Sequence, residues 1–206
     1  MILDTILVGS YMVNCYITGS NQTKEVLIID PGANANQIIS HIEKQQYKPI
    51  GIVLTHGHGD HIGGVVELKS KYDVPIYLHA LDQPMVEEGS KNMTKFMFGK
   101  SIEFSPDHLL KEEDEIAVDT LTYHILHTPG HTPGGVSIYC ENALFTGDTL
   151  FQGSIGRTDF PGGSFEQLIH AIKTKLLTYP DDTKVYPGHN SPSTIGWEKK
   201  HNPFLK

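Results

Sequence analysis

Hydrophobic positions along the chain follow two different periods, and each period predicts a different kind of element. Apolar residues in the first 30 positions alternate with polar ones or form short runs, which predicts strands. Residues 34–47 carry Ile38, Ile39 and Ile42 at helical spacing. The short apolar run Ile50–Leu54 is typical of a strand that is buried on both faces.

Predicted strands and helices alternate in the same way along the rest of the chain. Further strands are expected at residues 75–78, 121–125, 136–139, 143–145 and 184–186, and helices from residue 62 and at residues 80–88, 165–177 and 194–200. No linker or low-complexity stretch interrupts the alternation in either half. We therefore expect one domain, residues 1–206, with two sheets face to face and helices outside them.

Residues 89–106 form the least regular segment of the chain. They include the large apolar residues Met93, Phe96, Met97 and Phe98. One interpretation is a mobile apolar flap over a site, and the other is ordinary packing of a surface excursion. We favour ordinary packing, because methionine and phenylalanine most often serve as packing residues.

A histidine-rich motif directly follows the apolar run Ile50–Leu54. It reads Thr-His-Gly-His-Gly-Asp-His over residues 55–61 and stops where the next helix is expected. Its potential metal ligands are His56, His58, Asp60 and His61. Strand ends of this kind are where α/β sheets bind ligands, and the two glycines allow tight turns between the side chains. Imidazoles and a carboxylate together suit a borderline-soft ion such as zinc. A solvated turn or an expression tag would not lie between an apolar strand and an apolar helix.

Three later turns repeat the same order of strand, tight turn and potential ligand. They place His131 in Thr128–Gly134, Asp148 in Thr146–Thr149, and His189 in Tyr186–Asn190. Each turn alone is a weak signal, since Pro-Gly-His sequences are usually only turns. Combined with the first motif, they supply seven ligands, which is enough for two metal ions that share one bridging residue.

The His-x-His-x-Asp-His motif, followed by a single His, Asp and His in that order, resembles the metallo-β-lactamase superfamily. The likeness runs from the strand Asn14–Tyr16 to His189 and is greatest to the glyoxalase II branch, the hydroxyacylglutathione hydrolases, especially its short single-domain members. It implies an α/β (α+β) fold, namely a four-layered αββα sandwich of two mixed sheets with helices on the outer faces and the site at one edge.

The same resemblance implies a dinuclear metal centre. The first ion would be bound by His56, His58 and His131, the second by Asp60, His61 and His189, and both by Asp148. We expect two divalent ions, with zinc favoured and iron or manganese also compatible with these ligands.

The implied activity is hydrolysis of a small-molecule thioester of the S-lactoylglutathione type by a hydroxide that bridges the two ions. Asp60 and Asp148 are predicted to act in catalysis as well as in metal binding, Asp60 by orienting the hydroxide. β-Lactamases of the best-known subclass are similar but have a cysteine at the bridging position. The aspartate at residue 148 therefore argues against antibiotic hydrolysis.

Three other functions stay open. The main rival is a persulfide dioxygenase, whose family is similar and uses a single iron on the ligands of the first site. A lactonase of the same superfamily is the next, because the same hydroxide can attack a lactone carbonyl. A non-enzymatic metal-binding module is disfavoured because all seven ligands are present. Full glyoxalase II enzymes also continue into a C-terminal helical domain that grips glutathione, whereas here one short helix follows His189. The thiol carrier can therefore differ.

A glycine-rich loop at residues 151–159 follows the bridging aspartate. Its Arg157 is predicted either to bind a substrate carboxylate or to anchor the loop through Asp159 or backbone carbonyls. The other histidines are interpreted as structural residues, with His79 and His127 near enough to the motifs to support a ligand.

Composition narrows the class of protein and its location. The net charge of −8 argues against a nucleic-acid binder, including an RNA-processing nuclease of the superfamily. The longest apolar runs are far shorter than a transmembrane helix requires, so no membrane association is expected. Cys15 and Cys140 lie in strand-like runs and are expected to be buried free thiols, which favours the reducing cytoplasm.

Overall fold

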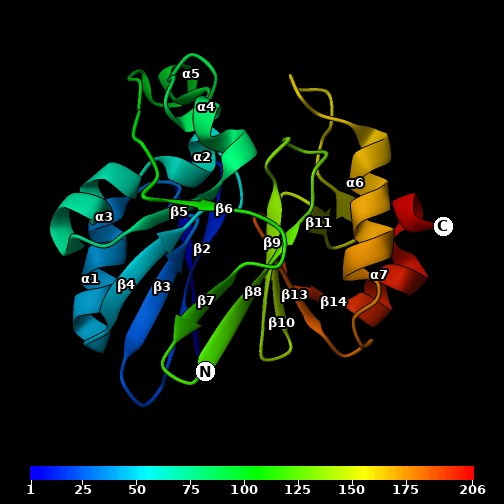
Figure 1. Cartoon of the computed structure of the whole chain (residues 1–206), viewed down its shortest axis with the longest axis horizontal. Helices are drawn as coiled ribbons and strands as arrows, with labels where there is room; N and C mark the ends of the chain where they lie inside the picture. Colours follow the sequence, from blue (N-terminus) through cyan, green and yellow to red (C-terminus); the bar gives the residue numbers. More distant parts are fainter.

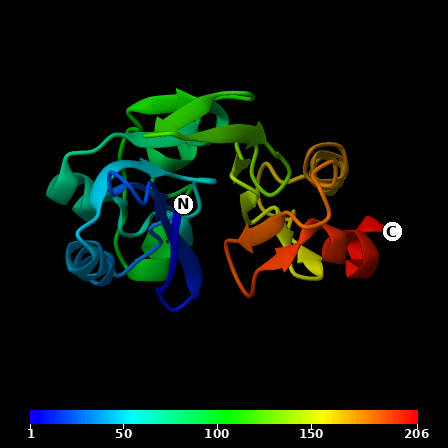
Figure 2. The same cartoon turned by 90° about the horizontal axis from the view of Figure 1, so that it is seen from below.

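A computed structural model describes all residues from Met1 to Lys206 and shows four layers, with two six-stranded sheets between outer helices (Figure 1). In the view from below, the N-terminal half, blue to cyan, and the C-terminal half, yellow to red, lie side by side (Figure 2). The predicted αββα sandwich of two mixed sheets is therefore confirmed.

The first sheet is built from the N-terminal half of the chain. Its strands, in spatial order, are β1 (Ile2–Val8), β2 (Val13–Gly19), β3 (Glu25–Ile29), β4 (Lys48–Val53), β5 (Ile76–His79) and β6 (His108–Leu110). The first three strands pair antiparallel, and β3 to β6 pair parallel. The parallel strands bring their carboxyl ends to one edge of the sheet.

The second sheet comes from the C-terminal half. Its strands, in spatial order, are β14 (Ser193–Thr194), β13 (Lys184–Pro187), β10 (Ala143–Gly147), β9 (Val136–Cys140), β8 (Leu121–His127) and β7 (Glu115–Val118). Only β10 and β13 pair in parallel. A separate hairpin of β11 (Leu150–Phe151) and β12 (Ser154–Ile155) follows β10.

Helices cover the outer face of each sheet. They are α1 (Ala35–Gln45), α2 (Gly59–Ile62), α3 (Val65–Tyr72), η1 (Ala80–Asp82), α4 (Gln83–Val86), α5 (Thr94–Phe98), α6 (Phe165–Ala171), the π-helical turn η2 (Ile172–Leu176), α7 (Ile195–His201) and η3 (Pro203–Leu205). In Figure 1, α1 and α3 lie outside the first sheet, α6 and α7 lie outside the second, and α2, α4 and α5 gather at the top. No helix has both the length and the apolar character needed to cross a membrane.

Three apolar clusters separate the four layers. The largest packs α1 and α3 on the first sheet, and the smallest packs α6, η2 and α7 on the second. The middle cluster lies between the sheets, where Leu27 and Val53 of the first meet Ile125 and Phe145 of the second. Removal of this apolar surface from water is the main force that holds the layers together.

Two expected helices differ in detail from their prediction. The helix expected from residue 62 is divided, because α2 ends at Ile62 and α3 begins at Val65. Between the two helices, a Cβ on Gly63 would overlap the carbonyl oxygen of Gly32, so only glycine fits this close backbone approach. The helix expected at residues 165–177 changes from α to π geometry after Ala171.

Candidate metal centre

Four strand ends bring the seven predicted ligands to one edge of the sandwich. The loop after β4 and the short helix α2 carry four of them, and the segments after β8, β10 and β13 carry one each. The seven residues are His56, His58, Asp60, His61, His131, Asp148 and His189.

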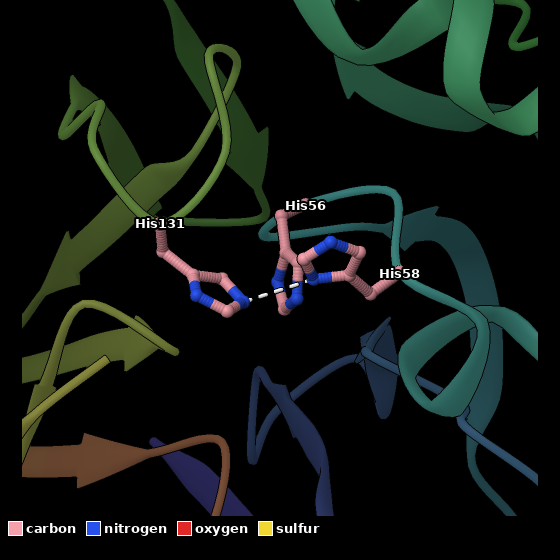
Figure 3. A group of neighbouring side chains, drawn as sticks. All are labelled: His56, His58 and His131. Atoms are coloured by element: carbon pink, nitrogen blue, oxygen red, sulfur yellow. Dashed lines mark hydrogen bonds between the residues drawn. The ribbon is translucent and has the colours of Figure 1, made fainter. Parts of the chain in front are cut away.

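The ligand atoms form two groups. Those of His56, His58 and His131 all lie within 4.8 Å of one another, and their rings converge from the two halves of the molecule (Figure 3). Those of Asp60, His61 and His189 form a second group within the same limit.

Asp148 lies between these two groups. Its carboxylate is 3.6 Å from Nε2 of His131 in the first group. It is 3.3 Å from Nε2 of His61 and 3.6 Å from Nε2 of His189 in the second. One carboxylate therefore reaches both groups, which is the arrangement a bridging ligand requires.

Each imidazole except that of His58 has its Nδ1 held by a partner outside the cluster. Nδ1 of His56 contacts Oγ1 of Thr55 at 3.1 Å. Nδ1 of His131 contacts the carbonyl oxygen of Arg157 at 2.7 Å, and Nδ1 of His189 that of Tyr11 at 3.1 Å. Such contacts fix the ring orientation and the tautomer, so that Nε2 is left to coordinate.

The exception, His58, presents its other nitrogen to the cluster. Its Nδ1 lies 2.9 Å from Nε2 of His131, the contact marked in Figure 3. The short His-Gly-His spacing thus directs His56 and His58 at the same point through different ring atoms.

Asp30, which was not predicted to be a functional residue, supports the second group. One carboxylate oxygen accepts a hydrogen bond from the amide of Thr55 at 2.8 Å, and the other from the Thr55 hydroxyl at 2.6 Å. The second oxygen also contacts Nδ1 of His61 at 3.0 Å. Since both oxygens are already engaged, Asp30 acts as the orienting partner of His61.

Asp82 is a second buried carboxylate near the ligands that was not predicted from the sequence. It is fully buried and has no cationic partner. It accepts hydrogen bonds from the amides of Gly57 at 3.0 Å and Gly134 at 2.7 Å, and from the hydroxyl of Thr132 at 2.7 Å. Gly57 separates two ligands of the first group, and Thr132 adjoins the third, His131. Asp82 therefore connects, through hydrogen bonds, the loop that carries His56 and His58 to the loop that carries His131.

Three buried polar atoms inside the cluster have no hydrogen-bond partner: Nε2 of His56, Nε2 of His61 and Oδ1 of Asp148. Buried polar atoms in folded proteins are nearly always satisfied, by protein, water or an ion. Buried, unsatisfied atoms of ligand type in both groups and on the residue between them fit bound metal ions.

Burial and the neighbouring charges give His56, His58 and Asp148 protonation states that suit metal binding, whereas the carboxylates near His61 and His189 outweigh burial and raise the pKa of both rings. Burial lowers the pKa of His56 well below its ordinary value and that of His58 to about 4, so both rings are neutral at neutral pH. Burial raises the pKa of Asp148, but the nearby imidazoles, His61 first, outweigh it and hold this pKa well below its usual range. Neutral imidazoles and an ionised carboxylate are the forms that coordinate metals.

Arg157 lies beside the site, but its guanidinium is engaged within its own loop. Nε and Nη2 each donate a 2.8 Å hydrogen bond to the carboxylate of Asp159, and the guanidinium lies 3.9 Å above the ring of Phe160. The structure thus shows the loop-anchoring contact, while binding of a substrate carboxylate remains a prediction.

The other histidines lie apart from the cluster. His79 and His127 stack on each other with ring centroids 4.1 Å apart, and Nε2 of His127 contacts the carbonyl oxygen of Pro133 at 2.9 Å. His41 contacts Asp4, and His124 contacts Glu115. These contacts agree with the structural roles expected for them.

A cavity of about 670 Å³ opens directly onto the cluster. His58, Asp60, His131, Asp148 and His189 form its floor, so both groups are accessible from it. A family model for the metallo-beta-lactamase superfamily matches residues 8–189, which include every predicted ligand. The chain belongs to the metallo-beta-lactamase superfamily.

Curated members of the superfamily match the chain along nearly all of their length. The "Hydroxyacylglutathione hydrolase GloC" of Haemophilus influenzae is 40% identical over 209 residues, covering 100% of this chain and 98% of the relative. The "Probable metallo-hydrolase YqgX" of Bacillus subtilis is 39% identical over 201 residues, covering 96% of this chain and 94% of the relative. The chain is thus a metallo-hydrolase of this superfamily.

Solved structures agree with this fold. The "BLEG-1 B3 metallo-beta-lactamase" has a TM-score of 0.94 and 40% identity, with 100% of both chains covered. TTHA1623 in a di-iron-bound form has a TM-score of 0.87 and 34% identity, covering 98% of this chain and 100% of that one. ETHE1 from Myxococcus xanthus has a TM-score of 0.81 and 27% identity, covering 98% of this chain and 84% of that one.

Proposed function

We propose that the protein hydrolyses a thioester of the hydroxyacylglutathione type, represented by S-lactoylglutathione, and uses two divalent metal ions. The observation that carries the proposal is the position of Asp148 between two complete groups of three ligands. The similarity to the hydroxyacylglutathione hydrolase of Haemophilus influenzae supports the thioester.

In this proposal, each group holds one ion. The first is held by His56, His58 and His131, the second by Asp60, His61 and His189, and Asp148 binds both. Zinc suits these ligands, and the di-iron form of TTHA1623 makes iron the alternative to test. When bound, two such ions polarise a carbonyl oxygen and lower the pKa of water toward neutrality.

The chain's own residues account for the rest of the chemistry. The carboxylate of Asp60 is on the cavity floor, 3.4 Å from Nε2 of His189, and is placed to accept a proton from an attacking water and orient it. A thiolate is a good leaving group, so no further acid is required beside the scissile bond. Buried, unpaired Cys15 and Cys140 support a reducing compartment, and we place the reaction in the cytoplasm.

The test is hydrolysis of S-lactoylglutathione by purified protein whose metal content has been measured, with zinc-loaded and iron-loaded samples compared. Loss of the thioester absorbance at a rate proportional to protein, and abolished in Asp148→Ala, is expected. Absence of turnover by protein that holds two ions per chain would overturn the proposal.

A persulfide dioxygenase is the second candidate, because the three-histidine group is complete by itself and could hold a single iron. Oxygen consumption with glutathione persulfide by the iron-loaded protein would identify it. A lactone and a chromogenic β-lactam should be assayed as alternative substrates in the same experiment. The β-lactam is needed because a chain that is 40% identical carries the name of a B3 metallo-beta-lactamase, although the residue at position 148 argued against that activity.

A further inference from the structure

The cavity above the metal centre has an apolar wall that the proposed chemistry does not use. Away from the ligands, most of its lining is apolar. These lining residues are Tyr11, Met93, Phe96, Met97, Phe151, Ile155 and Phe160. Three of them, Met93, Phe96 and Met97, lie on α5 or at the residue before it. α5 thus adds side chains to the same cavity as the metal ligands.

Phe96 is the most exposed large hydrophobic residue of the chain, at 81% exposure. It lies on α5 and lines the cavity, so its ring faces solvent next to the reaction centre. A phenylalanine at the mouth of a cavity gains free energy when a ligand covers it. The neighbouring thioether side chains of Met93 and Met97 adapt readily to different apolar shapes.

α5 is firmly anchored at its base. The side chain of Asn92 accepts hydrogen bonds from the amide and hydroxyl of Thr94 at 3.0 and 2.7 Å, and donates one to the carbonyl oxygen of Ile102 at 2.8 Å. Asn92 and Thr94 are both fully buried. α5 also packs against α2, where a Cβ on Gly59 would lie 3.0 Å from Sδ of Met97. Phe96 is therefore presented by a fixed scaffold beside the ligand-bearing helix.

The wall offers little positive charge to an anionic substrate. Arg157 is the only lysine or arginine in the cavity lining. The Nε–Nη2 face of its guanidinium is already occupied by the carboxylate of Asp159, with both hydrogen bonds at 2.8 Å. Glutathione carries two carboxylates and one ammonium group, so the cavity lining offers it one cation that is already paired with Asp159.

We propose that the preferred substrate carries an uncharged, apolar chain, and that Phe96 is the residue that selects it. The inference rests on the proposed thioesterase function and names its substrate class. S-Lactoylglutathione would be hydrolysed, but as a poorer substrate than a thioester that carries such an apolar chain. The apolar chain of the substrate belongs either to the thiol or to the acyl group, and the experiment separates these two cases.

Two series of thioesters test the proposal. In one, lactate is joined to straight-chain thiols of increasing length; in the other, acyl groups of increasing length are joined to a short thiol. The wild-type kcat/KM should rise by roughly twofold to fourfold for each added methylene in one series. It should exceed that of S-lactoylglutathione by about tenfold at six carbons.

In Phe96→Ala, kcat/KM should increase much less with the length of the substrate's apolar chain. Phe165→Ala is the matched control, because Phe165 is 54% exposed at the start of α6 and does not line the cavity. The control should keep the wild-type dependence on chain length. An equal dependence in Phe96→Ala and the wild type, or faster hydrolysis of S-lactoylglutathione than of every apolar thioester, would overturn the inference.

Binding of the corresponding thioethers, which cannot be hydrolysed, separates failure of the inference from failure of the proposed function. If no thioester is hydrolysed, the proposed function is wrong, and calorimetry with these ligands still decides the role of Phe96. Affinity that rises with chain length in the wild type and in Phe165→Ala but not in Phe96→Ala supports it. Affinity independent of length in all three proteins rejects it.

Discussion

The carboxylate of Asp82 accepts a 2.7 Å hydrogen bond from the hydroxyl of Thr132, 50 residues further along the chain. The same oxygen accepts from the amide of Gly57, so one buried oxygen joins a loop of the first half to a loop of the second. His56, His58 and His131 are carried by these two loops. The geometry of the three-histidine group therefore depends on a residue that is not a ligand.

Asp82→Asn should weaken binding of the first ion while the second stays bound. The amide can reproduce one accepting oxygen, but its nitrogen then faces an N–H donor that it cannot satisfy. We expect a roughly tenfold to hundredfold loss of affinity for one of two ions, measured by titration with zinc or cobalt.

The control for this substitution is Asp107→Asn, which also removes a carboxylate that accepts a backbone N–H, that of Ile76, far from the ligand loops. It should leave both binding steps intact. Equal weakening of both ions in Asp82→Asn would show that the residue acts only on general stability.

Asp148→Ala should lose most bound metal and nearly all activity, because its carboxylate lies within 3.6 Å of Nε2 atoms of both ligand groups. Elemental analysis of the purified variant measures the metal per chain. Asp181→Ala removes an exposed carboxylate that pairs with Lys199 on α7 and should retain both ions. Two ions per chain in Asp148→Ala would contradict the bridging assignment.

Gly188→Ala should also reduce metal binding, although residue 188 supplies no ligand. A Cβ there would overlap the carboxylate of Asp148 and lie 2.7 Å from Cε1 of His61. Gly99→Ala is a useful comparison, since its Cβ meets nothing within 4 Å and only the positive φ of 70° is strained. We expect Gly99→Ala to cost about 1 kcal/mol of stability without loss of metal. Full metal content in Gly188→Ala would be inconsistent with the packing described.

Arg157→Ala distinguishes the two roles predicted for this residue. If the guanidinium only anchors the loop, KM should change to a similar extent for charged and uncharged thioesters, and Asp159→Ala should have the same effect. If it binds a substrate carboxylate, KM should rise selectively for S-lactoylglutathione. Steady-state kinetics on both substrates and both variants separates these outcomes.

Stability should fall as the pH is lowered from about 6.5 toward 4, in part because of His79. Burial, and then the neighbouring His127, lower the pKa of His79 to about 4. Its unfolded pKa is about 6.5, so the unfolded chain binds the proton more readily, and acid favours unfolding across this interval. Thermal unfolding of His79→Asn should depend less on pH between these limits than that of the wild type. His170→Asn, at an exposed position, is the control.

The sequence was most informative where a ligand follows an apolar strand. The residues after β4, β8, β10 and β13 could be named because an apolar run, a glycine turn and a coordinating side chain occur within a few positions of one another. The layered fold also followed from the change of period between strands and helices.

Residues that act through contacts distant in sequence could not be identified in the same way. Asp30 directly follows a strand and precedes a Pro-Gly turn, and this place at a strand end could have identified it. Asp82 lies in a short helical turn with no such signal, and only tertiary structure shows its partners. The close approach of Gly63 to the backbone of Gly32 is likewise a tertiary contact, which no local propensity encodes.

The two ligand-bearing halves also meet beneath the metal centre. The side chain of Asn14 donates to the carbonyl oxygens of Pro187 and Asn190, both at 2.9 Å, and the hydroxyl of Tyr16 donates to that of Pro187 at 2.7 Å. Metal ions bound by ligands from both halves hold the two halves together, and these sites exist only in the folded protein. At a free metal concentration 100 times Kd, a single ion adds about 2.7 kcal/mol to the free energy of unfolding. The abundance of the protein in the cell should then follow metal supply, because starved chains open, and are degraded, more often than loaded ones.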